Sequence, residues 1–200
     1  MKVAGLTGGS GTGKTTIAHY FVRQYQAYLI DADRIGHDII KKGRPAYTLL
    51  VDHFGCEILE ATEGINRKKL GAIVFSDKEK LSLLNEITHP FIVKEIKKRI
   101  HYATQSQEYS FILIDGALLV EAKIHENVDE LWAVYTSMEN RICRLKKRDF
   151  LSEAQIKQRI ESQMPWDTLK QYANRIIDNN GDFTVTMLQC DQIADTFLTT

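Results

Sequence analysis

The sequence predicts an α/β protein with three layers, α/β/α, around a parallel sheet of about five strands. Five short apolar runs have the length and composition of buried strands: 3–7, 27–30, 111–115, 131–135 and 175–177. Helical patterns separate these runs, and strands that alternate with helices form βαβ units with parallel pairing. A chain of 200 residues is long enough for one such domain with a sizeable core.

The first strand leads directly into a glycine-rich loop. Residues 8–15 read Gly-Gly-Ser-Gly-Thr-Gly-Lys-Thr and fit G-x-x-x-x-G-K-[ST], whose backbone N–H groups surround the phosphates of a nucleoside triphosphate. In that pattern Lys14 reaches the β- and γ-phosphates, and the Thr15 hydroxyl binds Mg²⁺. Apolar residues follow at helical spacing from Ile17 to Tyr25, so the loop presents its amides at a helix N-terminus, where phosphate is favoured.

Two aspartates follow strand candidates at the edge of the sheet where ligands of open α/β folds collect. Asp33 comes soon after the second strand, so its carboxylate is a candidate to lie near a bound nucleotide. Alternatively it caps a helix that begins near Arg34, and the two roles are compatible because a cap uses one carboxylate oxygen. Asp115 ends the third strand, where P-loop enzymes place a carboxylate that holds Mg²⁺ or its water.

Between the second and third strands the pattern is helical, over about residues 41–110. Gly43–Pro45 separates two helices, and Pro90 is expected at the first position of a helix over 91–102. This block is too long for a plain crossover connection. We therefore predict a helical substrate-binding insert at about 32–106. His89 is a candidate there, although a lone histidine is more often structural.

Three arginines fall on one face of the helix after the fourth strand: Arg141, Arg144 and Arg148. One interpretation is a solvated face that complements the helix C-terminus. The other is a group of guanidinium ions that neutralises phosphate charge during transfer, which their position favours. The polar helical segment that follows, about 151–172, has the profile of a lid that excludes water. The core is then expected at about 1–31, 107–150 and 173–200.

The charge balance argues against a polyanionic partner. Lys and Arg total 26, as do Asp and Glu, so no global field favours nucleic acid or a membrane surface. Cys56, Cys143 and Cys190 are widely spaced without a metal or redox pattern, which is typical of reduced thiols. No signal-peptide core or membrane-spanning run is expected. We therefore expect a cytoplasmic protein, a monomer or weak homo-oligomer, whose partners are small molecules.

Taken together, these motifs resemble the dephospho-CoA kinase family. The matching stretches are Gly5–Gly9 with the loop, Asp31–Asp33, Phe54-Gly55, Gly64–Arg67, Leu84-Asn85, His89-Pro90, Leu118-Leu119 with Glu121, Arg144, Arg148-Asp149, Arg159, Gln163, Lys170 and Asp178–Gly181. They cover nearly the whole chain, and their order and spacing are more specific than any one of them besides the loop. The chain departs from the family pattern at Ser10, Ala117 and Asn174.

The resemblance implies a P-loop kinase fold like that of adenylate kinase, with a core, a CoA-binding insert and a lid. It implies MgATP-dependent phosphorylation of the ribose 3′-hydroxyl of dephospho-CoA, the last step of coenzyme A synthesis. The residues that would bind ATP phosphates are Gly11, Thr12, Gly13, Lys14, Thr15 and Thr16. Asp33 would take the proton of the attacking hydroxyl, and Arg144 and Arg148 would face the nucleotide. Arg67 and His89 are candidates for substrate binding, and Thr15 and Asp115 for Mg²⁺.

Two other functions stay open at this point. The first is a nucleoside monophosphate kinase on the same fold. Asp115-Gly116 begins like the Asp-Gly-Phe-Pro-Arg stretch of adenylate kinases, but Ala117-Leu118 follow without the Pro-Arg. The second is a nucleotide-binding regulator that hydrolyses ATP poorly and signals by lid closure. Production of ADP with dephospho-CoA, with AMP or with neither would separate the three.

Overall fold

A computed structural model describes residues 1–149 and 152–199. The chain forms two compact units, one of Met1–Asp31 with Ile100–Thr200 and one of Ala32–Arg99, here called unit 1 and unit 2. Unit 2 begins where the predicted insert begins and ends seven residues before the predicted boundary at 106. The first residue of the predicted lid, 151, and residues 150 and 200 of the predicted core lie outside the described residues.

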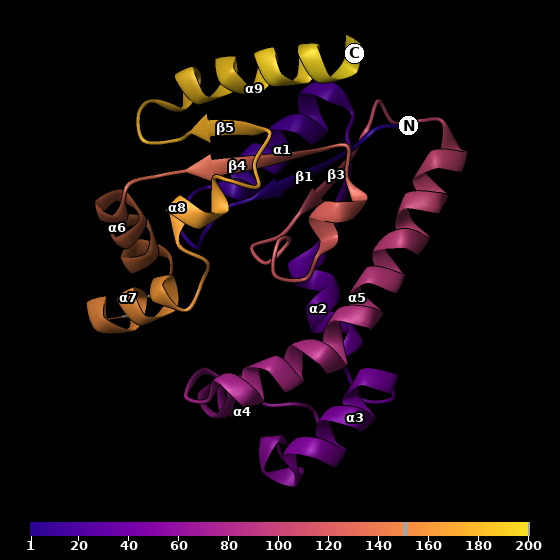
Figure 1. Cartoon of the computed structure of the whole chain (residues 1–200), viewed down its shortest axis with the longest axis vertical. Coiled ribbons are helices and arrows are strands. Elements are labelled where there is room, and N and C mark those ends of the chain that lie inside the picture. Colours follow the sequence, from indigo (N-terminus) through magenta and orange to yellow (C-terminus); the bar gives the residue numbers. More distant parts are fainter. Residues whose placement is uncertain (150–151, 200) are drawn as a thin grey trace. The chain divides into compact units, whose positions relative to one another are not determined.

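Unit 1 is built on a five-stranded sheet (Figure 1). The strands are β1 (Val3–Thr7), β2 (Tyr28–Asp31), β3 (Ile112–Asp115), β4 (Glu130–Tyr135) and β5 (Arg175–Asp178). Their order is β2-β3-β1-β4-β5, and every neighbouring pair is parallel. All five strand predictions are confirmed. The central strands carry nearly continuous apolar runs because they are covered on both faces, whereas only Ile177 is buried in the edge strand β5. The α/β class with a parallel sheet is confirmed as well.

The core of unit 1 lies between the sheet and two helices, α1 (Lys14–Tyr25) and α9 (Phe183–Thr199). At its centre is Trp132 of β4, which is fully buried. Its ring centroid lies 5.0 Å from that of Phe21 in α1 and 5.2 Å from that of Phe197 in α9. On the opposite face, a Cβ on Gly5 would approach side chains of Leu119 and Leu131. Both faces of the sheet are therefore covered.

Three further helices of unit 1 follow β4: α6 (Met138–Asp149), α7 (Glu153–Glu161) and α8 (Trp166–Leu169). A short 3₁₀ helix, η2 (Ile124–Asn127), lies between β3 and β4. Ile156 and Ile160 of α7 pack with Leu145 of α6 in a small apolar cluster. The helical character expected for the segment after α6 is thus present in its described part.

Unit 2 contains α2 (Ala32–Ile39), α3 (Pro45–Phe54), the 3₁₀ helix η1 (Cys56–Ile58) and α4 (Arg67–Phe75). It also contains most of α5 (Lys78–Ser106), whose last residues belong to unit 1. The helices share a small core of their own: Leu50, Phe54, Ile58, Leu70, Val74 and Ile87. The break expected at Gly43–Pro45 is confirmed, since α2 ends at Ile39 and α3 has Pro45 at its first position.

The prediction that a helix begins at Pro90 is wrong, because α5 runs through Pro90 without a break in its assignment. A proline inside a helix loses one backbone hydrogen bond and costs about 3 kcal/mol. Ile87 before it and Ile96 after it are both buried. Burial of such a side chain stabilises by about 1.5–3 kcal/mol, so packing on both sides offsets the cost. Helix α2 also begins at Ala32, two residues earlier than expected.

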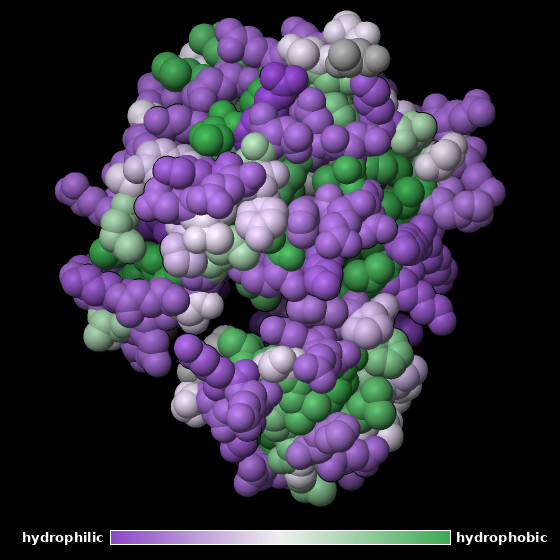
Figure 2. Space-filling model, in the orientation of Figure 1, coloured by the Kyte–Doolittle hydropathy of each residue, from purple (hydrophilic) through white to green (hydrophobic). Residues whose placement is uncertain are grey.

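The face shown in Figure 2 is mostly hydrophilic, with apolar residues in small groups. Among the described residues, none of the helices combines the length and the apolar character needed to cross a bilayer.

Candidate nucleotide-binding and phosphoryl-transfer site

The glycine-rich loop joins β1 to α1, as the sequence predicts. Gly13 precedes the first residue of α1 with φ of 92°, in the left-handed region that glycine adopts without steric cost. A Cβ at Gly13 would also collide with the side-chain amide of Asn179. Since α1 begins at Lys14, the N–H groups of its first turn point out of the helix, which favours an anion there.

Three side chains from other elements fix the carbonyl oxygen of Thr12. Asn179 Nδ2 donates to it at 2.8 Å, Arg144 Nη1 at 3.2 Å and Thr136 Oγ1 lies 3.1 Å away. Arg144 Nη2 also donates to the carbonyl of Asn179 at 2.8 Å. The loop is therefore held in shape by the residue after β5, by the residue after β4 and by α6. These contacts fix the backbone of the loop, so a ligand that binds there requires less ordering of the loop.

A second set of contacts holds Ser10, two residues before Thr12. Arg141 Nε of α6 donates to the carbonyl of Ser10 at 2.8 Å. The backbone N–H of Ser10 donates to Gln163 Oε1 at 2.8 Å. Gln163 lies between α7 and α8, so the segment predicted to form a lid contacts the loop directly. Burial lowers the pKa of the Arg141 guanidinium below its ordinary value.

The two residues expected to touch phosphate and metal stand at the start of α1. Lys14 Nζ donates to the carbonyl of Gly8 at 2.6 Å, so the ammonium group lies over the loop itself. Thr15 and Thr16 are exposed in the first turn of α1. The loop thus carries a cation, two hydroxyls and helix N-terminal amides within three consecutive residues.

Asp115 ends β3 and is about 9% exposed. In the register of the sheet it pairs with Leu6 of β1 on one side and with Asp31 of β2 on the other. Two carboxylate residues at one level of neighbouring strands concentrate negative charge, which a divalent cation would neutralise. The described residues contain no cluster of three or more His, Cys, Asp or Glu able to hold a metal.

This donor set fits Mg²⁺. That ion usually keeps several waters and binds one or two protein oxygens together with substrate phosphates, rather than an all-protein cage. One hydroxyl, that of Thr15, and one carboxylate, that of Asp115, are of this type. Both are hard oxygen ligands.

Arg148 is placed differently from Arg144, although both are on α6. Its guanidinium forms a two-pronged pair with Asp149, with Nε to Oδ1 at 2.6 Å and Nη2 to Oδ2 at 2.9 Å. Arg159 of α7 binds the same carboxylate at 2.8 Å. The neighbouring arginines hold the pKa of Asp149 below its ordinary value. Arg144 therefore supports the loop, while Arg148 belongs to a cluster that joins α6 to α7.

The remaining predicted residues belong to unit 2. Asp33 is exposed in the first turn of α2, two residues after the end of β2. Arg67 is the exposed first residue of α4. His89 lies half-buried in α5, where burial lowers the pKa of its imidazole and keeps the ring neutral at pH 7. Their approach to the loop residues of unit 1 stays a prediction.

Three residues that shape the loop were not predicted as site residues: Thr136, Gln163 and Asn179. The fourth, Arg141, was placed by its helical spacing in the arginine group with Arg144 and Arg148. The other three reach the loop across long stretches of sequence, from 124 to 167 residues away. Gln163 and Asn179 fall in stretches that match the family pattern, but no local spacing indicates that they contact the loop.

Comparison with known proteins identifies the family. A family model described as dephospho-CoA kinase matches residues 2–184. The chain belongs to the dephospho-CoA kinase family. Among its relatives is the dephospho-CoA kinase of Carboxydothermus hydrogenoformans, 42% identical over 189 residues, which are 94% of this chain and 91% of that protein. The dephospho-CoA kinase of Aquifex aeolicus is 40% identical over 98% of this chain and 97% of its own.

Solved structures share the fold of this chain. The dephospho-CoA kinase from Campylobacter jejuni superposes with a TM-score of 0.70 at 25% identity, over all of this chain and 98% of its own. The protein TT1252 from Thermus thermophilus has a TM-score of 0.81 at 22% identity, over 98% of this chain and 97% of its own. A shikimate kinase from Acinetobacter baumannii shares the fold, with a TM-score of 0.55 at 16% identity.

One departure from the family pattern has a structural account. By the resemblance described above, Asn174 stands where the family pattern has an aspartate. Its Oδ1 accepts a hydrogen bond from the backbone N–H of Leu131 at 2.7 Å, and its own N–H donates to the carbonyl of Leu131 at 2.8 Å. An amide oxygen accepts that bond as a carboxylate oxygen would. The change therefore preserves the link between β4 and the start of β5.

Proposed function

We propose that this chain transfers the γ-phosphoryl group of ATP to the ribose 3′-hydroxyl of dephospho-CoA and so produces coenzyme A. The observation that carries the proposal is the family match over residues 2–184 in a chain whose loop is built for a triphosphate. The loop is held by Asn179, Arg144 and Arg141, which supports a site organised before the nucleotide arrives.

Phosphoryl transfer depends mainly on position and on the neutralisation of charge. Lys14 binds the β- and γ-phosphates, and the amides from Gly11 to Thr16 surround them. Thr15 and Asp115 would hold Mg²⁺, which would supply positive charge to the phosphates. Arg144 keeps the loop in shape, and Arg148 adds positive charge near the nucleotide once it exchanges Asp149 for phosphate. All these residues come from unit 1.

Unit 2 supplies the acceptor side. Asp33 orients the 3′-hydroxyl and takes its proton, which leaves the oxygen free to form the new P–O bond while ADP departs. Its place at the start of α2, directly after β2, supports this role because ligands of such folds bind beyond the carboxyl ends of the strands. Arg67 offers a cation for phosphate of the substrate. His89, neutral at pH 7, offers a hydrogen bond rather than a charge.

An acceptor-dependence assay tests the proposal against the two alternatives. With MgATP, we expect ADP to form with dephospho-CoA and to remain at background with AMP or without an acceptor. The product should resist periodate, because phosphate on the 3′-hydroxyl removes the vicinal diol of the ribose. ADP formation with AMP would support a nucleoside monophosphate kinase, and slow hydrolysis without any acceptor would support a regulator.

We further propose that the reaction takes place in the cytoplasm and that the chain acts as a monomer or weak homo-oligomer. Its cysteines are all free, which fits a reducing compartment: Cys56 and Cys143 are exposed and Cys190 is buried. Size-exclusion chromatography with light scattering would show a stable oligomer if one forms.

A further inference from the structure

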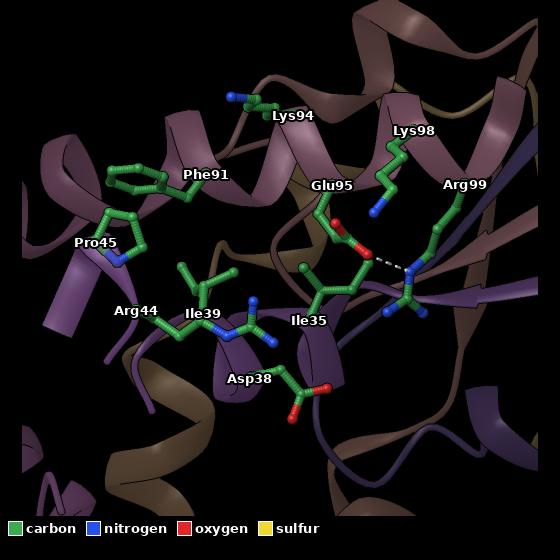
Figure 3. A pocket seen from close by; sticks show the side chains of 10 residues that line it. All are labelled: Ile35, Asp38, Ile39, Arg44, Pro45, Phe91, Lys94, Glu95, Lys98 and Arg99. Atoms are coloured by element: carbon green, nitrogen blue, oxygen red, sulfur yellow. Dashed lines mark hydrogen bonds and ion pairs between the residues drawn. The ribbon is translucent and has the colours of Figure 1, made fainter. Parts of the chain in front are cut away.

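Unit 2 contains a cavity of about 540 Å³ between α2, α5 and the start of α3 (Figure 3). This volume lies in the range of small-molecule sites, roughly 300–1,000 Å³. Its apolar lining comes from three elements: Ile35 and Ile39 of α2, Pro45 of α3 and Phe91 of α5. The ring of Phe91 lies beside Pro45 at one end of the cavity. An apolar or aromatic group would be covered there.

The charged residues of the cavity are not in balance. Its two acids already have cationic partners: Asp38 binds Lys41 at 2.6 Å, and Glu95 binds Arg99 at 3.0 Å. Arg44 and Lys98 point into the cavity, and Lys94 lies at its rim (Figure 3). Among the described residues, none forms an ion pair with any of these three cations.

The excess of positive charge has a local cost. Lys94 and Lys98 are one helical turn apart, where like charges repel each other. An anion bound between α5 and Arg44 would relieve that repulsion. A phosphate group suits both cations, since a guanidinium binds it with two parallel hydrogen bonds and an ammonium acts as a point charge.

The faces of α2 and α5 that line the cavity differ from the faces that carry the predicted acceptor residues. At about 100° per residue, Ile35, Asp38 and Ile39 centre on the side of α2 that is opposite Asp33. By the same count, the five cavity residues of α5 centre on the side opposite His89. Neither Asp33 nor His89 lines the cavity.

We propose that this cavity is a second ligand site, separate from the acceptor site, which binds a phosphate ester carried on an apolar or aromatic body. Arg44 and Lys98 bind the phosphate, and Phe91, Pro45 and Ile39 cover the apolar part. The ligand contacts α2, which carries Asp33, so the site is placed to restrain that helix. The proposal does not depend on which acceptor the enzyme phosphorylates.

Phenyl phosphate is a simple probe with both parts of the expected ligand. The full chain should be saturated with MgADP first, so that the glycine-rich loop cannot take the probe. We expect NMR shifts on titration to gather in residues 35–45 and 91–99. We expect benzyl alcohol, which lacks the phosphate, to produce no such shifts. Shifts confined to other segments, or equal binding of benzyl alcohol, would overturn the proposal.

Charge variants test the cations named. Arg44→Gln and Lys98→Gln should each weaken the binding of phenyl phosphate about tenfold, the loss expected for one charge-assisted contact. Lys97→Gln is the matched control, because Lys97 is exposed on the same helix, next to Lys98, and does not line the cavity. It should change the affinity by less than about twofold. Equal affinities of all three variants and the parent chain for phenyl phosphate would contradict the proposed site.

Discussion

The side-chain amide of Asn179 donates a hydrogen bond to the carbonyl of Thr12 at 2.8 Å. This bond joins the residue after β5 to the middle of the glycine-rich loop. Asn179 is 5% exposed, and its Oδ1 in turn lies 3.1 Å from the hydroxyl of Thr186 in α9. The C-terminal part of the chain thus determines the shape of a loop near the N-terminus.

Asn179→Ala should lower the free energy of unfolding by about 1–3 kcal/mol, because it leaves buried polar groups without their partner. It should also raise the KM for ATP, since the loop loses one of its supports. Thermal unfolding measures the first effect, and initial rates at varied ATP concentration measure the second. Asn127→Ala, at an exposed position, is the control and should change neither. An unchanged KM in the first variant would show that the loop keeps its shape without Asn179.

Two arginines of one helix should respond differently to replacement. Arg144→Ala removes contacts to Thr12, Thr136 and Asn179, so both stability and kcat should fall. Arg148→Ala removes an exposed pair with Asp149, and such pairs contribute about 0–1 kcal/mol. It should therefore leave the melting temperature nearly unchanged while kcat falls. Steady-state kinetics and calorimetry on both variants separate the two roles. A normal kcat for Arg148→Ala would show that Arg148 takes no part in catalysis.

Asp33→Asn should retain ATP binding and lose most turnover, about 100-fold or more, which is typical when a general base is removed. The amide keeps the size of the side chain but cannot take the proton of the hydroxyl. Binding of a fluorescent ATP analogue and ADP release with dephospho-CoA give the two measurements. Asp52→Asn, at an exposed position of α3, is the matched control. Near-normal turnover in Asp33→Asn would contradict the assignment.

Lys14→Ala should reduce kcat more than stability. The ammonium group donates to carbonyls of its own loop, those of Gly8 and Gly9, and the largest effect of its loss is expected at the phosphates that it would bind. Loss of one charge that stabilises a transition state costs about 100-fold or more in kcat. Circular dichroism checks that the variant is folded, and single-turnover kinetics measure the chemical step. A folded variant with full kcat would show that Lys14 only binds nucleotide.

The sheet could be predicted closely because most of its strands are largely apolar runs, and the loop because its motif is local. The continuity of α5 through Pro90 could not be predicted from the sequence, because it depends on the burial of Ile87 and Ile96 in the folded chain. The supports of the loop were missed for a related reason. Asn179 and Gln163 meet it only after β4 and β5 have joined the sheet, so no spacing in the sequence reports them.

Glu121 connects the turn after β3 to the segment between α7 and α8. The backbone N–H groups of Glu121 itself and of Met164, the residue after Gln163, act to lower the pKa of its carboxyl. Its Oε2 is buried with no hydrogen-bond partner among the described residues. Burial raises the pKa of the Glu121 carboxyl above its ordinary value, more than these contacts lower it.

This raised pKa predicts how stability changes with pH. Below the ordinary glutamate value, both folded and unfolded chains hold the proton, so Glu121 makes no difference. Above it the unfolded chain releases the proton first, so the contribution of Glu121 to stability falls as pH rises through the folded pKa. Glu121→Gln should therefore raise the melting temperature at pH 8 and raise it less at pH 4. Glu126→Gln, an exposed neighbour in η2, should shift it equally at both pH values. If the melting temperatures of Glu121→Gln and the parent chain differ by the same amount at every pH from 4 to 8, a buried carboxyl at this position is contradicted.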